Sequence, residues 1–313
     1  MKLALLLVLL ALAVAAQAQP KTYAQWAQFE PANFDPAHTR SFEVGDLRVV
    51  VGDAYAHGGS DRPSYTGLHH LSHKLRGSNV FCPLYAGMIG LRRECQLASV
   101  GDDGAVIWVG EGKGKVSEEY IVRPPYYVDH TARFTAGGET GGWNDTSYMN
   151  GPSDPGIYLI QTDGKWVRHY SETHGDRASV APAGMDPLPP IQKVENARYA
   201  HGTNGFWDGF SDLRFDPKYP LFYGRFDDMV LIFMIERRWG QDLIPYMSPS
   251  GGGYSEEFQR KNPAWDYRFW LRGLTPGQEV AIRSRLVYKP FVSQDDVLAE
   301  YEKWTKELPA LTP

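Results

Sequence analysis

The stretch "MVLIFMI", residues 229–235, is apolar at every position. An unbroken apolar run of this kind predicts a central β-strand that is covered on both faces. The stretch "EVAIRSRLVYK" (279–289) alternates instead, because apolar residues such as Val280, Ile282 and Leu286 are separated mainly by polar ones. Alternation with a period of two predicts a strand with one mainly apolar face.

The composition fits many short strands joined by turns. Aromatic residues make up 13% of the 313 residues, and the 32 glycines and 22 prolines are scattered without a repeat, which argues against a helical bundle. Asp102-Asp103-Gly104 and Asp163-Gly164 each separate two candidate strands, as in β-hairpins. The sequence therefore predicts an all-β protein, with residues 19–313 forming a single large antiparallel two-sheet β-sandwich of the supersandwich-like kind.

One long amphipathic helix is expected at the C-terminal end. Ser293 is a good N-cap, and Asp295 and Asp296 suit the first turn, where the helix dipole favours negative charge. The residues that follow form one apolar face at helical spacing, made of Val297, Leu298, Tyr301, Trp304 and Leu308. We expect this helix to pack on the sheet as a terminal clasp, with segments 20–40 and 290–313 wrapping outside the sandwich.

The first eighteen residues have the features of a signal peptide. Lys2 gives a positive start, Leu3 to Ala16 is apolar, and Ala16-Gln17-Ala18 is a small-x-small cleavage site. The apolar run is too short to span a membrane. We therefore expect cleavage after Ala18 and a secreted or periplasmic mature chain with no membrane span.

Charge, glycines and cysteines narrow the possible partners. The formal net charge is −5 and no basic stripe is present, which argues against nucleic acid. The stretch "SPSGGGYSEEF" (248–258) lacks the lysine and the spacing of a phosphate loop, which argues against nucleotide binding. Cys82 and Cys95 are the two cysteines, and outside the cytoplasm they form either one disulfide or two buried free thiols.

The stretch "GLHHLSH" (67–73) places His69 and His73 at the spacing that a zinc metalloprotease helix uses. That motif needs a catalytic glutamate where this chain has His70, and the preceding "GGSDRPSY" is typical of a loop. We therefore expect a polar loop at the rim of a cleft, and no cofactor. The alternative is a metal site in which two of these histidines act with His57 or a distant carboxylate.

In "PPYYVDHTARFTA" (124–136), the two prolines end one strand and alternation defines the next. The apolar face of this strand consists of Val128, His130, Ala132 and Phe134. The polar face consists of Tyr127, Asp129, Thr131 and Arg133. His130 is therefore expected to be a hydrogen-bonded core histidine, and the polar face is either solvated or a sheet floor that holds sugar hydroxyls.

Four stretches resist interpretation as strands, and long ordered loops tend to carry function. They are 52–78, 136–155, 172–212 and 247–263. The segment "HGTNGFWDGFSDLRFDP" (201–217) brings a base, carboxylates and aromatic rings together, which suits glycosidases, because they use paired carboxyls and sugar rings stack on tryptophan. The other interpretation is a loop with Asx turns and an anchored tryptophan.

A smaller signal lies at Arg92, Arg93 and Glu94, which follow one another directly. Two arginines beside a glutamate either neutralise an acidic sugar, as a polysaccharide lyase requires, or form a surface ion pair.

Four segments of the sequence resemble a known group of proteins: "NVFCPLYAGMIGLRREC", "PPYYVDHTARFTA", "SPSGGGY" and "RLVYKPF". Together they resemble a group of secreted proteins of environmental bacteria. The broader pattern is similar to the galactose-mutarotase-like sandwiches of sugar epimerases, polysaccharide lyases and glycoside hydrolases. The resemblance implies a sandwich and carbohydrate chemistry, but it assigns no residue a role.

The predicted function is that of a secreted carbohydrate-active enzyme that cleaves glycosidic bonds of a polysaccharide or oligosaccharide, as a glycoside hydrolase or a polysaccharide lyase. The alternative is a non-catalytic carbohydrate-binding or surface module. We expect one cleft shared by the loops 52–78, 141–155 and 201–212. The candidate catalytic residues are His201 as base, Asp208 or Asp212 as acid or orienting partner, His57 as alternative base, and Glu94. The candidate substrate-binding residues are Trp143, Trp207, Asn144, Tyr127, Asp129 and Arg133.

Overall fold

The computed structural model describes most of the chain. The described residues are 34–56, 66–81, 95–109, 114–136, 143–145, 147–171, 178–185, 210–237, 243–250, 254–255, 260–261, 263–271 and 275–308. The predicted signal peptide and Cys82 lie outside these ranges, so the cleavage site and the disulfide stay predictions.

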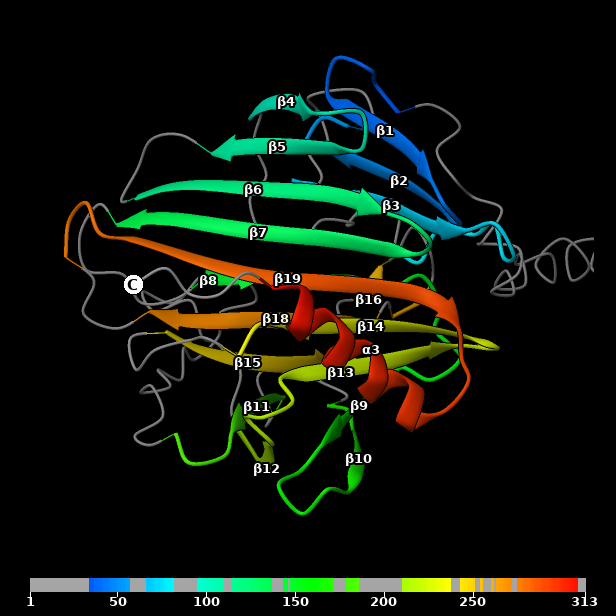
Figure 1. Cartoon of the computed structure of the whole chain (residues 1–313), viewed down its shortest axis with the longest axis vertical. Helices are drawn as coiled ribbons and strands as arrows, with labels where there is room; N and C mark the ends of the chain where they lie inside the picture. The colour runs from blue at the N-terminus through cyan, green and yellow to red at the C-terminus, as the bar shows by residue number, and fades with distance from the viewer. Residues whose placement is uncertain are drawn as a thin grey trace, which may run out of the picture.

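A nine-stranded antiparallel sheet forms one layer (Figure 1). Its strand order is β10-β9-β13-β14-β19-β7-β6-β5-β4. The strands are β4 (Gln96–Val100), β5 (Gly104–Val109), β6 (Gly114–Arg123), β7 (Tyr127–Ala136), β9 (Ile157–Ile160), β10 (Trp166–His169), β13 (Leu221–Phe226), β14 (Met229–Ile235) and β19 (Glu279–Pro290). The β4–β5 and β9–β10 pairs confirm the two predicted hairpins.

Two smaller sheets form the other layer. One holds β1 (Thr39–Val44), β2 (Leu47–Gly52) and β3 (Gly67–His73). The other has the order β12-β11-β15-β18-β8, with β8 (Trp143–Asp145), β11 (Ser179–Pro182), β12 (Phe210–Phe215), β15 (Leu243–Ser250) and β18 (Ala264–Leu271). A short hairpin of β16 (Tyr254–Ser255) and β17 (Arg260–Lys261) is separate from both.

Backbone hydrogen bonds join the two smaller sheets. Val80 N donates to Leu71 O at 2.9 Å, and Asn150 N donates to Val80 O at 2.7 Å. Met149 N then donates to Pro263 O at 2.8 Å, just before β18. One hydrophobic core cluster draws side chains from all three sheets and fills the space between the layers. The predicted antiparallel two-layer sandwich is confirmed, with one parallel pair, β11–β12.

The stretch 229–235 is the central strand that its composition predicts. All seven residues of β14 are buried, between β13 and β19. Leu231 and Phe233 belong to the core between the layers. Val230 and Ile232 belong to a second cluster on the outer face, under the C-terminal helix.

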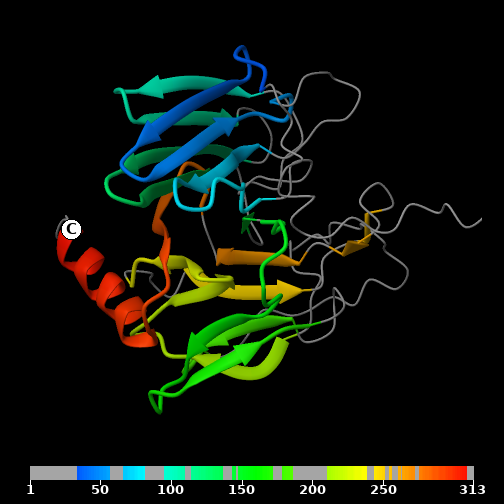
Figure 2. The ribbon, with the colours of Figure 1, turned by 90° about the vertical axis from the view of Figure 1, so that its right-hand side faces the viewer.

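That helix, α3 (Gln294–Glu307), lies against the outer face of the nine-stranded sheet (Figure 2). Ser293 Oγ accepts a hydrogen bond from Asp296 N, which confirms the predicted N-cap. Val297, Tyr301 and Trp304 are buried in the outer cluster. The prediction that the C-terminal helix packs on the sheet is therefore confirmed as well.

Strand β19 differs from its prediction of one apolar face. Its second half is buried on both faces, and Arg285 and Lys289 are only 4% and 5% exposed. The reason is α3, which covers the outer face and provides acidic partners. Glu307 accepts from Arg285, and Glu300 accepts from Lys289.

The four stretches that the sequence did not predict to be strands contain five whole strands, β3, β8, β11, β16 and β17. They also contain the last residues of β15 and the first residues of β12. The prediction was wrong because these strands are short or carry polar side chains on buried positions, so neither alternation nor an apolar run marks them.

Candidate functional site

The histidine stretch is not a polar loop at a rim. Gly67–His73 is β3, and all seven residues are buried. A register shift opposite Val50 and Val51 forms a bulge in the β2–β3 pair. His69 Nε2 donates to Gly52 O at 3.1 Å, and His70 Nε2 is hydrogen-bonded to Ser72 Oγ at 2.8 Å.

These histidines are core residues, and His73 Nδ1 accepts from Leu75 N at 3.2 Å while its Nε2 lies 3.6 Å from Asp46. Burial, with a smaller effect of the positive charge of Arg48, lowers the pKa of His70 to about 3. Burial also lowers the pKa of His73, against the opposing effect of Asp46. Among the described residues, no group of three or more His, Cys, Asp or Glu side chains is arranged to hold a metal ion. His57 lies outside them, so a site that includes it is untested.

The polar face of β7 lies on the outer side of the sheet, away from the second layer. Tyr127 OH donates to Glu300 Oε2 at 2.9 Å and thereby holds α3. Asp129 accepts from Arg123 Nε at 2.7 Å and from Arg285 Nε at 2.5 Å. Two of the three candidate sugar contacts of this strand are therefore engaged in docking the helix.

Arg133, the third, remains partly open. Its side chain is 43% exposed and lies 3.6 Å from Glu119 in an ion pair. The floor of the space between the layers is formed by the opposite face of β7.

That inner face carries His130, which lies in the core as the alternation predicts, with 2% of its surface exposed. Nε2 of His130 is hydrogen-bonded to Glu118 Oε2 on β6. Nδ1 lies 2.9 Å from Ser284 Oγ on β19 and 3.2 Å from Tyr267 OH on β18. The ring of Tyr120 stacks on the imidazole with centroids 4.8 Å apart.

We call Glu118, Tyr120, His130, Tyr267 and Ser284 the interlayer cluster. Four members come from neighbouring strands of the nine-stranded sheet, and Tyr267 reaches them from the opposite layer. With Glu118 ionised, Nε2–H of His130 donates to the carboxylate, and the single lone pair of Nδ1 accepts from the Ser284 or the Tyr267 hydroxyl, which lie 3.3 Å from each other. The result is a chain of groups that can pass a proton between Tyr267 and His130, with a carboxylate in place to stabilise the imidazolium.

Sequence reasoning singled out only His130 of this cluster. A signal for Glu118 exists, since the alternation of β6 puts it between Val116 and Tyr120 on the buried face. Ser284 has the same signal between Ile282 and Leu286. Tyr267 has none, because its contact joins two layers.

Of the remaining predicted site residues, the structure describes some and not others. The backbone of β8 pairs with β18, with Asp145 opposite Tyr267 and Asn144 opposite Arg268. Asp212 is exposed on β12, at the other edge of the same sheet. Four inter-strand steps of about 4.8 Å separate these edges, roughly 19 Å in all. The structure therefore does not place Asp212 beside β8.

Five candidates, His57, Glu94, His201, Trp207 and Asp208, lie outside the described residues. The shared cleft that they define is untested. Within the described part of the chain, no helix has the length and apolar character needed to cross a membrane.

Comparison with known proteins gives likenesses of structure only. No protein family model matches the chain, and no curated protein matches its sequence. The chain is similar to a GalM/aldose epimerase homologue from C. elegans, with a TM-score of 0.50 and 6% identity over 81% of this chain and 99% of that one. The two proteins share a fold. At this level the resemblance to galactose-mutarotase-like sandwiches is confirmed.

Two larger enzymes are also similar. Heparan sulfate lyase HepC from Pedobacter heparinus gives a TM-score of 0.42 at 9% identity, over 86% of this chain and 41% of the lyase. The α-N-acetylgalactosaminidase NagBb from Bifidobacterium bifidum gives 0.36 at 11% identity, over 86% of this chain and 38% of the glycosidase. The chain thus spans well under half the length of either enzyme.

Proposed function

We propose that this protein is an exported carbohydrate-active enzyme that cleaves glycosidic bonds by proton transfer at the interlayer cluster. The observation that carries the proposal is the hydrogen-bonded chain from Glu118 through His130 to Tyr267. It lies on the inner face of the large sheet, in a sandwich that resembles an aldose epimerase homologue. Carboxylate, imidazole and phenol are the groups that general acid–base catalysis uses.

The chemistry that this set suits best is elimination at a uronic acid residue. His130, with Glu118 stabilising its charge, would take the proton from the carbon next to the sugar carboxylate. The electron pair released would form the carbon–carbon double bond as the glycosidic carbon–oxygen bond breaks. Tyr267 would give its proton to the departing oxygen and recover one from His130. The consecutive Arg92 and Arg93 are the candidates for neutralising the sugar carboxylate.

Hydrolysis is the weaker candidate at this cluster. Glycoside hydrolases use two carboxyl groups, about 5–5.5 Å apart when they retain and about 6.5–9.5 Å apart when they invert the configuration. The interlayer cluster contains one carboxylate, Glu118. A hydrolase would therefore need a second carboxyl group from elsewhere. Asp208 is the candidate, in the segment for which the sequence predicts His201 as the base.

A second candidate function is a non-catalytic carbohydrate-binding module. The observation that favours it is burial, because Glu118, His130, Ser284 and Tyr267 are between 0% and 4% exposed. Buried polar groups must be hydrogen-bonded whether or not they react. In this case the cluster would only fix the distance between the layers.

The test compares two tyrosine-to-phenylalanine variants. Tyr267→Phe removes a buried hydroxyl from the cluster. Tyr301→Phe removes an equally buried hydroxyl that donates to Ile235 O at 3.1 Å under α3, and it is the matched control. Both variants are checked by circular dichroism. The substrates are heparan sulfate, polygalacturonate, alginate, xylan and chitin, assayed for reducing ends and for a product double bond that absorbs in the ultraviolet.

Elimination predicts ultraviolet-absorbing products from an acidic polysaccharide, a loss of kcat of about 10²-fold or more in Tyr267→Phe, and unchanged kcat in Tyr301→Phe. Full activity of a folded Tyr267→Phe variant would exclude the interlayer cluster. If His201→Ala or Asp208→Ala then abolished activity, the reaction would belong to the 201–212 segment. Retention on a polysaccharide with no product would identify a binding module.

A further inference from the structure

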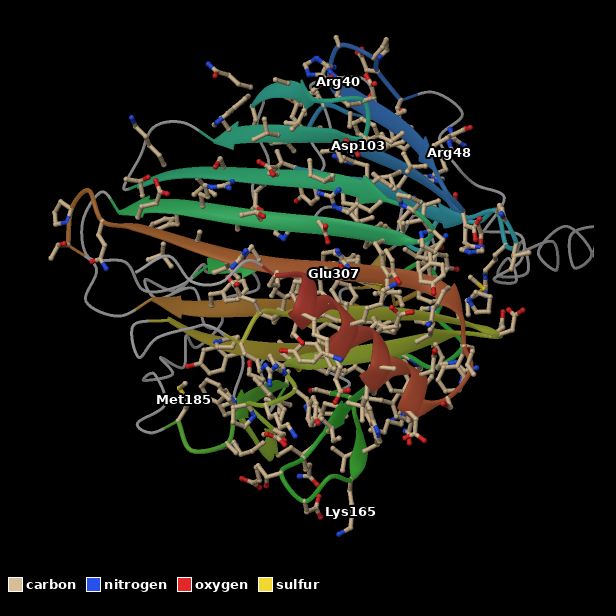
Figure 3. The ribbon with its side chains drawn as sticks, in the orientation of Figure 1. Arg40, Arg48, Asp103, Lys165, Met185 and Glu307 are labelled. Carbon is tan, nitrogen blue, oxygen red and sulfur yellow. The ribbon has the colours of Figure 1, made fainter. Side chains whose placement is uncertain are left out.

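The described elements cover the outer face of the nine-stranded sheet over about half of its width. Helix α3 crosses in front of β19, β14 and β13, whereas no described element lies in front of β4, β5, β6 and β7 (Figures 1 and 3). We call the outward side chains of these four strands the open face. It is the opposite face from the one that carries the interlayer cluster.

The strand register places one residue from each of the four strands in a row across this face, and the four side chains differ in chemical type. Gln96 pairs with Trp108, Trp108 with Ser117, and Ser117 with Arg133. Neighbouring strands are about 4.8 Å apart, so the row extends over roughly 14 Å. Trp108 is 42% exposed, while Ile107 on the other face is fully buried.

Trp108 differs from the other large apolar side chains that are exposed in the described part of the chain. Those are Leu75, in the turn after β3, and Val292, between β19 and α3. Trp108 instead lies within a regular strand. Its two cross-strand neighbours are Gln96, which has an amide group, and Ser117, which has a hydroxyl group. An indole ring flanked by hydrogen-bonding groups offers a stacking surface with polar contacts on both sides.

The charges of the open face argue for an uncharged ligand. Arg133 is ion-paired with Glu119, and Arg283 on the adjacent β19 is ion-paired with Glu236 at 2.9 Å. Lys115, exposed at the start of β6, is the one cation on the described residues of β4 to β7 for which no ion pair is found. A nucleic acid or another polyanion would need several such cations. A protein partner, including a second copy, would need about 800 Å² per side with an apolar centre. On the described part of this face Trp108 is the one large apolar side chain that is exposed, and Val106 beside it is buried.

We propose that the open face is a binding site for a neutral polysaccharide that lies across β4 to β7. Trp108 stacks on the apolar face of one sugar ring, and Gln96, Ser117 and Arg133 bind hydroxyl groups beside it. This goes beyond the proposed function, because the site is on the other side of the sheet from the interlayer cluster and needs no catalysis.

The experiment measures retardation of the full chain in native gels containing xylan, soluble β-1,3-glucan, hydroxyethyl cellulose or heparan sulfate. Trp108→Ala should weaken binding to at least one neutral polysaccharide about tenfold, the usual effect of losing one stacking contact. Trp108→Phe should retain part of the affinity. Leu75→Ala and Val292→Ala, which remove side chains that are 68% and 70% exposed, are the matched controls and should bind normally.

Equal retardation of Trp108→Ala and the unmodified chain in every neutral gel would overturn the proposal. Binding to heparan sulfate alone, abolished by salt, would also overturn it in favour of an acidic ligand. A dimer that dissociates on Trp108→Ala substitution would identify a second copy as the occupant. Tyr267→Phe should bind like the unmodified chain, so a failure of the proposed catalysis would leave this result unaffected.

Discussion

Replacing Lys289 by methionine tests how the C-terminal helix is held. The side chains of Lys289 and Glu300 are 6% and 8% exposed and form an ion pair under α3. Lys289 Nζ also donates to Asp296 Oδ1 at 3.0 Å. Glu300 accepts from Tyr126 OH at 3.1 Å and from Tyr127 OH at 2.9 Å. Lys289→Met keeps most of the side-chain volume and leaves Glu300 as a buried carboxylate without its cation.

Removing one partner of a buried pair costs about 3–5 kcal/mol, and the two tyrosine donors place this case near 3 kcal/mol. The same argument predicts that a second substitution, Glu300→Gln, changes the free energy of unfolding in opposite directions in the unmodified protein and in Lys289→Met. Glu300→Gln should destabilise the unmodified protein, because it removes the buried carboxylate partner of Lys289 and leaves Asp296 as its one acidic partner. In the Lys289→Met background it should instead stabilise by about 1–2 kcal/mol, because glutamine still accepts from the tyrosines and carries no charge.

The pH dependence follows from the pKa of Glu300. Burial alone would raise this pKa, but hydrogen bonds from Lys289 and Tyr127 outweigh burial and hold it below the ordinary value. The pair therefore stabilises the unmodified protein above the pKa of an unfolded glutamate, about 4.3, and that stability is lost as pH falls through the lower folded value. In Lys289→Met, burial dominates and Glu300 is best tolerated when protonated. The stability difference between the two proteins should be larger at pH 7 than at pH 4.

Urea unfolding followed by circular dichroism measures all four proteins of this cycle. The reasoning is refuted if Glu300→Gln destabilises the Lys289→Met variant as much as it destabilises the unmodified protein. A stability difference that is independent of pH between 4 and 7 would also contradict it.

Two further predictions concern the core. A Cβ at Gly224 would overlap the ring of Trp265, so Gly224→Ala should destabilise the fold by about 3 kcal/mol. An unchanged thermal melting temperature would contradict this packing. Because the folded-state pKa of His70 is about 3, the unfolded chain binds the extra proton between about pH 6.5 and pH 3, so stability should fall as pH decreases through that window. His70→Gln cannot titrate and should show a shallower decline in urea unfolding; an equally steep decline would show that His70 does not contribute.

The parts of the fold that the sequence could predict are those set by local periodicity. The run 229–235 needs only its own composition to be recognised as a strand covered on both faces. The alternation in β7 is equally local, and it correctly separates His130 from Arg133. The helix follows from its cap at Ser293 and from one apolar stripe.

The parts that could not be predicted depend on contacts between distant residues. Strand β3 is buried although it contains three histidines, and the carbonyl of Gly52 on the neighbouring strand accepts from the ring of His69, 17 positions away. The burial of Arg285 on β19 requires knowing that α3 returns over it. Tyr267 reaches His130 from 137 positions away in the chain, and no spacing in the sequence marks that pair.

The alternation of side chains across one sheet also determines how the two proposed sites can act together. Ser117 and Glu118 are consecutive in β6, yet one belongs to the open face and the other to the interlayer cluster, because successive residues of a strand point to opposite faces. A polysaccharide segment stacked on Trp108 therefore has the whole sheet between it and His130. The segment held at the open face cannot be the segment that reacts. On a polymer that carries both neutral and uronic acid residues, binding of a neutral segment there would instead keep the protein attached. It would raise the local concentration of uronic acid segments at the inner face without contributing to the chemical step.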